Sequence, residues 1–249
     1  MSVTGGQRPD VPPVVRIAMW SGPRNISTAM MRAWEHRADC AVVDEPFYAC
    51  YLNGTGLAHP GREEVLHSQP TDWRVVVDQL TRGPLPGGAT VQYQKHMAHH
   101  LPRELDPAAL AGLRHAFLVR DPADVVVSYA KVRAEPTLED LGLPQQAELY
   151  ARLGGAVVDA RDVLQQPEPV LRALCDALDV PFDDAMLGWP AGRRATDGVW
   201  APHWYARAWE STGFAAYEPR REPVPDRLLG LVERCRPYYE ALAAHRIQA

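Results

Sequence analysis

Apolar and polar residues follow one another along this chain in blocks whose lengths predict strands and helices in turn. Five short runs rich in apolar and β-branched residues have the length of buried strands, at residues 14–20, 40–44, 89–95, 114–119 and 156–159. Residues at helical spacing predict helices at 26–36, 71–82, 122–133, 145–153, 169–178 and 226–245. This alternation predicts an α/β fold, a three-layer α/β/α domain with a central parallel sheet.

Two stretches interrupt the regular pattern. Residues 48–70 contain several Gly and Pro residues and are too long for a simple connection, which indicates an active-site insertion or lid. Residues 181–225 hold four Trp among Gly, Pro and Arg, which predicts an irregular aromatic-rich segment over the core. The polar stretch 1–13 predicts a disordered N-terminal segment, so residues 14–249 are expected to form a single domain.

Composition narrows the classes of partner. The formal charge of −5 argues against non-specific nucleic-acid binding, which needs a basic surface. No run reaches the ~18–20 apolar residues of a membrane span, and no signal peptide is recognisable at the N-terminus. The four cysteines are scattered without C-x-x-C pairing, which favours a cytoplasmic protein without a zinc site. No nucleic-acid or membrane partner is expected, and a homo-oligomer is compatible with the sequence.

The first segment with chemistry is SGPRNIST, residues 21–28, between the first predicted strand and helix. Unpaired N–H groups and the helix dipole favour an anion at such a helix N-terminus. Arg24 adds a charge, and Ser27 and Thr28 add hydroxyl donors. A nucleoside triphosphatase loop reads G-x-x-x-x-G-K-[ST], whereas here Ile26 replaces the second Gly and Ser27 replaces the Lys. A capped structural loop is the alternative.

The second segment is LVRDPADVVVSY, residues 118–129. Arg120 leaves the end of a strand, where open α/β sheets place their ligands, and Ser128 follows two turns into the next helix. This pair is suited to hold a phosphate by charge and hydrogen bond. The alternative is that Arg120 pairs at the surface with Asp121 or Asp124.

Together the two segments resemble the signatures of sulfotransferases that use 3′-phosphoadenosine 5′-phosphosulfate (PAPS). Residues 21–28 look like the 5′-phosphosulfate loop, P-[RK]-S-G-[ST]-T, although Asn25 and Ile26 stand where that loop has Ser and Gly. Residues 118–129 look like the 3′-phosphate motif, V-x-R-[ND]-P-x-D-x-x-x-S-[YF]. The resemblance spans about residues 15–190 and implies a P-loop-like fold of the small bacterial branch.

The resemblance also implies roles. Arg24 would contact the bridging oxygen and stabilise charge on the leaving phosphate, with Asn25 in the same loop. Ser27 and Thr28 would bind the 5′-phosphate, and Arg120 and Ser128 the 3′-phosphate. Arg193 and Arg194 stand where the family often has a basic loop on that phosphate.

An acceptor must lose a proton during the reaction, so a base is expected near the sulfur. Glu45 follows the second predicted strand and is the first candidate. The segment from Lys95 to Pro102 resembles the K-T-H-L-P segment of cytosolic sulfotransferases, so Lys95 would help neutralise the transferring group. Either His100 or His96 would be the histidine of that segment, and His100 ranks second as base.

A metal-free reaction is expected, because the sulfuryl group carries one negative charge and the P-loop Lys is missing. The sequence therefore predicts a PAPS-dependent enzyme acting on a small-molecule hydroxyl or amine. Two alternatives are a divergent P-loop kinase, with Asp44 holding Mg²⁺ for ATP, and a nucleotide-binding regulator without turnover. Three His within five residues also leave a metal site open.

Overall fold

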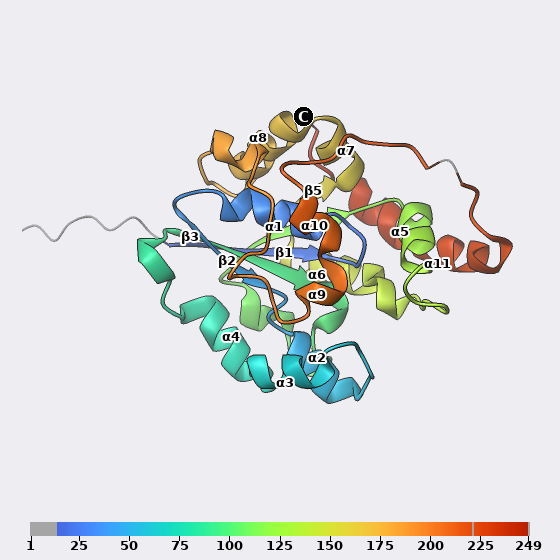
Figure 1. Ribbon diagram of the computed structural model, residues 1–249, viewed down its shortest axis with the longest axis horizontal. Helices are drawn as coiled ribbons and strands as arrows, with labels where there is room; N and C mark the ends of the chain where they lie inside the picture. The colour runs from blue at the N-terminus through green and yellow to red at the C-terminus, as the bar shows by residue number, and fades with distance from the viewer. Residues whose placement is uncertain (1–13, 221, 249) are drawn as a thin grey trace, which may run out of the picture.

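The computed structural model describes residues 14–220 and 222–248, and its five strands form one parallel sheet (Figure 1). The strands are β1 Val15–Ser21, β2 Cys40–Asp44, β3 Val91–Met97, β4 Arg114–Val119 and β5 Ala156–Asp159, in the spatial order β2-β3-β1-β4-β5. Helices cover both faces of the sheet, so the predicted three-layer α/β/α architecture is confirmed. The disordered segment expected at 1–13 lies outside the described residues.

All six predicted helices are present, each with one or both ends shifted. The helices are α1 Ser27–Glu35, α2 Tyr48–Thr55, α3 Arg62–Ser68, α4 Trp73–Arg82, α5 Pro122–Tyr129, α6 Leu143–Leu153, α7 Ala160–Gln165, α8 Pro167–Ala177, α9 Ala201–Trp204, α10 Ala206–Glu210 and α11 Asp226–Ala243. Short 3₁₀ turns add η1 Pro86–Gly88, η2 Ala98–His100, η3 Pro107–Leu110, η4 Glu139–Leu141 and η5 Asp184–Leu187. The segment 181–225 contains only short helical turns between irregular stretches.

The stretch 48–70, expected to be an active-site insertion or lid, forms the two helices α2 and α3. Gly54 lies within α2, and Gly56 and Gly61, with φ of 67° and 73°, flank the turn between the two helices. Strand β3 also runs two residues further than predicted. It continues because His96 and Met97 pair with Trp20 and Ser21 of β1.

Each face of the sheet has its own hydrophobic core, and successive side chains of β3 point alternately into the two cores. Val91 and Tyr93 pack in the core beneath α1 and α8. Trp20 and Phe117 belong to the opposite core, which α6 and α11 help to cover. Because side chains alternate along a strand, Lys95 extends on the α1 side and His96 on the other.

The carboxyl ends of β1 and β4 lie side by side, and their following helices depart in opposite directions along the sheet. Helix α1 leads to β2 on one side, and α5 leads towards β5 on the other. Such a switch in strand order opens a crevice at the carboxyl edge of a parallel sheet. The loop after β1 is close-packed there: a Cβ on Gly22 would collide with the backbone carbonyl of Leu141.

Candidate active site

The loop after β1 presents an uncapped helix N-terminus at this crevice. Helix α1 begins at Ser27, and no side chain accepts a hydrogen bond from its first turn. Arg24 and Ile26 have φ of 60° and 46°, in the left-handed region that a β-branched side chain rarely adopts. The related motif has Gly at the position of Ile26, so the chain keeps a glycine-like backbone there although the side chain differs. The free N–H groups are therefore available to an anion.

The structure brings Arg24, Ser128 and Arg120 together. Arg24 Nε donates to Ser128 Oγ at 2.9 Å, although the two residues are 104 positions apart. Arg120 Nη1 donates to the carbonyl of Arg24 at 3.1 Å, which ties the end of β4 to the loop after β1. Burial, followed by the charges of Arg207 and Arg120, lowers the pKa of Arg24. Positive charge is therefore concentrated around Arg24. Within the described residues, Arg24 makes no salt bridge.

Asn25 faces the interior instead of the crevice. The residue is 3% exposed, and its amide nitrogen donates to the carbonyl of Leu118 at the end of β4. Its amide oxygen is buried without a hydrogen-bond partner. In this structure Asn25 fixes the loop against the sheet, whereas Ser27 and Thr28 occupy the first turn of α1.

Arg220 is a second arginine near Arg120 that the sequence did not single out. Arg220 Nε is 3.1 Å from Asp124 Oδ1, and Arg120 Nε is 3.8 Å from Asp124 Oδ2. The three residues line a cavity of about 240 Å³, to which Arg161 and Arg236 also contribute. The ion pair between Arg120 and Asp124 considered from the sequence is therefore present. Arg220 also pairs with Asp124, so two guanidinium groups face one carboxylate and positive charge remains in excess there.

Arg193 and Arg194 lie apart from this cluster. Arg194 Nε is 3.7 Å from Glu35 Oε2, which lies at the C-terminal end of α1, away from the loop after β1. The guanidinium of Arg193 stacks over the ring of Trp209, 4.4 Å from its centroid. The structure does not bring either side chain to Arg120 and Ser128. From position, Arg220 is the better candidate for the basic partner of that pair.

A buried ionic network lies at the ends of β2 and β3. Lys95 Nζ donates to Asp44 Oδ1 at 2.9 Å, to Glu45 Oε1 at 2.5 Å and to Tyr205 Oη at 2.6 Å. An ammonium has three N–H donors, so all of those of Lys95 are used within the protein. Burial alone would lower the pKa of Lys95, but Asp44 and Glu45 hold that pKa well above its ordinary value. Lys95 therefore acts on Glu45 directly and reaches a substrate only if this network opens.

Glu45 faces His100 with its second oxygen. Glu45 Oε2 is 3.7 Å from His100 Nδ1, and this nitrogen has no hydrogen-bond partner. Burial raises the pKa of Glu45, while the charge of Lys95 opposes part of that rise. Burial and the neighbouring His99 lower the pKa of His100 well below its ordinary value, so the imidazole is neutral near pH 7. Glu45 also has φ of 42°, a strained backbone of the kind that clusters at functional sites.

His96 lies on the opposite face of the sheet, away from Glu45. Its ring stacks on Trp20 at 4.3 Å between centroids, and its Nε2 is 3.1 Å from Gln94 Oε1. Burial lowers the pKa of His96 to about 3. Of the two histidines left open by the K-T-H-L-P resemblance, the structure places only His100 beside Glu45.

The buried histidines are expected to make the fold sensitive to acid. Burial also lowers the pKa of His99, to about 4. The unfolded chain takes up protons near pH 6.5, whereas folded His96 and His99 resist protonation, so stability present above pH 6.5 is lost as the pH falls. Each histidine contributes up to ~1.4 kcal/mol per pH unit, and the raised pKa values of Glu45 and Asp159 offset part of this loss.

Urea unfolding of the wild type and of His96→Phe at several pH values between 7.5 and 4.5 measures this effect. The variant is expected to lose stability less steeply below pH 6. Parallel curves for the two proteins would contradict a depressed pKa at His96.

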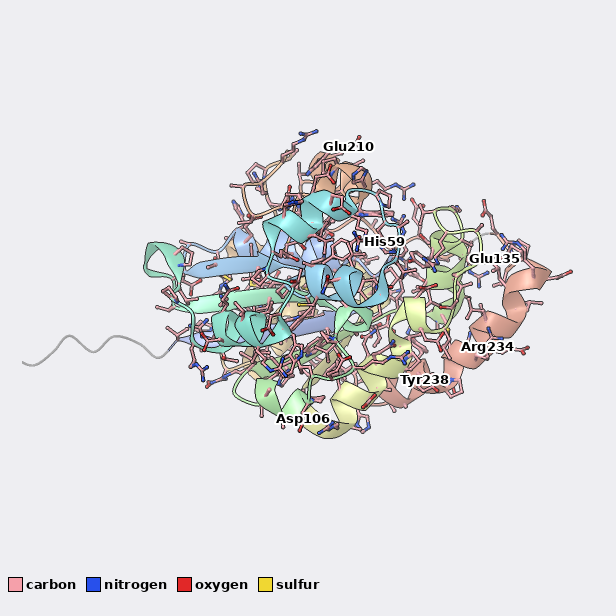
Figure 2. The ribbon with its side chains drawn as sticks, turned by 90° about the horizontal axis from the view of Figure 1, so that it is seen from below. His59, Asp106, Glu135, Glu210, Arg234 and Tyr238 are labelled. Carbon is pink, nitrogen blue, oxygen red and sulfur yellow. The ribbon has the colours of Figure 1, made fainter. Side chains whose placement is uncertain are left out.

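A groove of about 1200 Å³ begins at His100. Helix α2, the N-terminus of α4, the loop after β3 and α6 line it, with Tyr51, Trp73, His99 and Asp106 among the contributing residues. The rings of Tyr48 and Tyr51 both stack on the His100 imidazole, with centroid distances of 4.4 and 4.8 Å. Figure 2 labels His59, whose Nδ1 is 2.9 Å from Tyr48 Oη, and Asp106, which lines the groove.

The described residues also bear on two other features, a membrane span and a metal site. No helix within residues 14–220 and 222–248 is long and apolar enough to cross a bilayer. In the same part of the chain, no group of three or more His, Cys, Asp or Glu is placed to hold a metal ion. The histidines at positions 96, 99 and 100 do not converge, because His96 belongs to β3, whereas His99 and His100 belong to η2.

A parallel sheet with an arginine-bearing loop and an uncapped helix N-terminus after its first strand has the arrangement of a P-loop-like fold. A family model described as a sulfotransferase domain matches residues 15–246. The chain therefore belongs to the sulfotransferase family, which supports sulfuryl transfer as its general reaction and confirms the resemblance seen in the sequence.

Two curated relatives from Arabidopsis thaliana are named branched-chain-amino-acid aminotransferase-like proteins 1 and 2. They are 37% and 34% identical to this chain over 234 residues, which is 92% of its length. The chain spans about two-fifths of each relative, 42% and 41%. Their names describe proteins that extend well beyond the matched part.

Three solved structures share the fold. The sulfotransferase domain of the Synechococcus PCC 7002 olefin synthase has a TM-score of 0.54 at 18% identity, covering 93% of this chain and 98% of that one. A sulfotransferase domain of the curacin biosynthetic pathway has a TM-score of 0.56 at 15% identity and covers 94% and 99%. A sulfotransferase from Alicyclobacillus acidocaldarius has a TM-score of 0.52 at 13% identity and covers 94% and 97%.

Proposed function

We propose that this protein transfers the sulfuryl group of PAPS to a hydroxyl or amine of a small acceptor without a metal ion. The observation that carries this proposal is the convergence of Arg24, Arg120 and Ser128 beside the uncapped N-terminus of α1. Two guanidinium groups and a hydroxyl there suit a nucleotide with phosphates at both ends of its ribose. Arg24 has no carboxylate partner within the described residues, as expected of a cation that meets an anionic ligand.

The chemistry follows from these positions. The bond between sulfur and the bridging oxygen breaks as the acceptor oxygen or nitrogen bonds to sulfur, in line and through a loose transition state. Charge then builds on the departing 5′-phosphate, where Arg24 and the N–H groups of α1 stabilise it. The acceptor occupies the groove that begins at His100. Its proton passes to the pair of Glu45 and His100 beside that groove.

The kinase alternative is less well supported by the side chains present. The Asp44 carboxylate accepts hydrogen bonds from Lys95, from Tyr205 and from the backbone N–H of Gly198. Holding Mg²⁺ there would require this buried network to break. Ser27, at the position of the P-loop Lys, also offers no cation for a terminal phosphate.

Nucleotide binding provides the direct test. PAP, the desulfated product of PAPS, is expected to raise the melting temperature in the presence of EDTA, because a ligand that binds only the native state stabilises it. AMP differs from PAP only in lacking the 3′-phosphate and is expected to stabilise less, as is ATP. Differential scanning fluorimetry at equal ligand concentrations measures the order. Equal stabilisation by PAP and ATP would contradict the roles of Arg120 and Ser128.

Turnover separates an enzyme from a non-catalytic regulator. Incubation of the protein with PAPS and a metabolite extract is expected to yield at least one metabolite heavier by one sulfuryl group in mass spectrometry. An Arg24→Ala protein serves as the matched control for non-enzymatic transfer. PAP binding without any sulfurylated product would favour the regulator.

A further inference from the structure

Tyr205 joins the C-terminal part of the chain to the buried carboxylates. It lies between the short helices α9 and α10, is 4% exposed and points its hydroxyl at the ends of β2 and β3. The hydroxyl donates to Asp44, with both carboxylate oxygens at 2.8 Å, and accepts from Lys95 Nζ at 2.6 Å. It is also 3.4 Å from Glu45 Oε1. One side chain thus touches all three charged groups of the network.

The backbone around Tyr205 is anchored on both sides. Gly198 N donates to Asp44 Oδ2 at 3.2 Å, and a Cβ at Gly198 would collide with the ring of Trp200. Trp200 Nε1 in turn donates to Tyr205 Oη at 3.3 Å. Asp197 forms a salt bridge of 2.5 Å with the buried Arg32 of α1. The position of the Tyr205 hydroxyl is therefore set by the fold of this segment (Figure 1, orange).

The count of donors explains what this hydroxyl does. Asp44 and Glu45 are two buried carboxylates that share one ammonium, so Lys95 alone cannot satisfy both. The Tyr205 hydroxyl donates to Asp44 and accepts one Lys95 N–H, so each carboxylate receives one of the other two Lys95 N–H groups. We propose that Tyr205 is a positioning residue for Glu45, holding Lys95 between the two carboxylates and so fixing the site where the acceptor proton is received. The identity of that reaction rests on the proposed function, whereas the network itself does not.

The expected consequence is a change in the titration of Glu45. The groups facing Glu45 are Lys95, Asp44 and Tyr205 on one side and the neutral His100 on the other. Without the Tyr205 hydroxyl, Asp44 loses one of its donors, and Lys95 is expected to move towards it with the N–H that Tyr205 had accepted. Glu45 remains buried but loses part of its stabilising charge, so its pKa rises. Removing the Asp44 charge instead gives Lys95 wholly to Glu45, so its pKa falls.

The test compares Tyr205→Phe and Asp44→Asn with the wild type by carbon-detected NMR titration of protein labelled at the glutamate carboxyl carbons. The Glu45 signal is assigned by its loss in Glu45→Gln. The Glu45 midpoint is expected to move up by about one pH unit in Tyr205→Phe and down in Asp44→Asn. Tyr239→Phe is the matched control, because it removes a hydroxyl that donates to the buried Asp159 at 2.7 Å, away from Glu45.

An unchanged midpoint in Tyr205→Phe, or a shift of the same sign in both variants, would overturn the proposal. If Tyr205→Phe does not fold, the downward shift in Asp44→Asn still decides, because an unchanged or raised midpoint there contradicts sharing of Lys95. An equal shift in Tyr239→Phe would reduce the effect to a general loss of packing and would also overturn it. PAP binding by the same proteins is measured separately, as a test of the proposed function. Absence of PAP binding contradicts the proposed function and leaves the Glu45 titration to judge Tyr205.

Discussion

Arg24→Ala is expected to lower turnover by roughly 10²–10³-fold while weakening PAP binding by less than about tenfold. The reason is that its contact strengthens only as the leaving phosphate gains charge in the transition state. In the structure, Arg24 is held by Ser128 and lies close enough to Arg207 and Arg120 for their charges to lower its pKa further, after burial. The expected loss is therefore mainly electrostatic, with the loop backbone still in place.

Arg120→Ala is expected to show the opposite division. Removal of a guanidinium beside the 3′-phosphate should raise the Kd for PAP by roughly 10–100-fold and reduce the preference for PAP over AMP, with a smaller effect on kcat. Arg220→Ala should act in the same direction, because both arginines meet at Asp124. Calorimetry with PAP and AMP gives the affinities, and release of PAP from PAPS gives the turnover.

Two controls make the comparison specific. Arg194→Ala is expected to leave PAP affinity unchanged, since its guanidinium pairs with Glu35 at the far end of α1. Arg172→Ala removes an exposed arginine that pairs with Glu168 and Asp184, remote from the crevice. If Arg24→Ala lost only affinity, it would be a binding residue without a role in the transition state. If Arg194→Ala weakened PAP binding as much as Arg120→Ala, the assignment of Arg220 would be wrong.

Local pattern was sufficient to predict the sheet and the meeting of Arg24, Arg120 and Ser128 at its carboxyl edge. Strands β2, β4 and β5 were predicted with the bounds that the structure shows, because buried parallel strands appear in sequence as short apolar runs. The convergence of Arg24, Arg120 and Ser128 followed from a general property of parallel sheets: loops at the carboxyl edge meet there. Arg24 and Arg120 lie within three positions of a strand end, and Ser128 lies on the helix that follows β4, so the strands fixed their places.

Residues from the long C-terminal segment were beyond this reasoning. Tyr205 and Arg220 reach the site along an irregular path that no periodicity defines, so nothing local distinguishes them from Arg193 and Arg194. The helices within the insertion or lid expected at 48–70 were missed for a related reason. Gly and Pro marked turns correctly there, but the helices between those turns are only eight and seven residues long, and their pattern is too short to recognise.

The choice between His96 and His100 depended on one strand end. With β3 ending at Lys95, both histidines belonged to the following loop, and either was free to face Glu45. In the structure β3 extends to Met97, so His96 takes the opposite face from Lys95 by the alternation of strand side chains. The alternation was readable in the sequence, but the strand end was not.

The remaining question is which member of the pair receives the proton, and acceptor acidity is expected to answer it. For a weakly acidic acceptor, loss of the true base should reduce turnover by roughly 10²–10⁴-fold, whereas a phenol that is already partly ionised needs little help. We expect Glu45→Gln to show this dependence, because Glu45 is the only carboxylate of the network with an oxygen turned towards His100 and the groove. His100→Asn should show a smaller and flatter loss.

A graded series of substituted phenols and alcohols, chosen once one acceptor is known, provides the measurement, with kcat plotted against acceptor pKa for the wild type, both single variants and the double variant. Because Glu45 and His100 are in contact, their effects should not add, and the double variant should be no slower than Glu45→Gln alone. A steep dependence in His100→Asn with a flat one in Glu45→Gln would instead identify the histidine as the base. Neutral His100 would then take the proton, and Glu45, held by Lys95 and Tyr205, would orient the imidazole and stabilise its charged form.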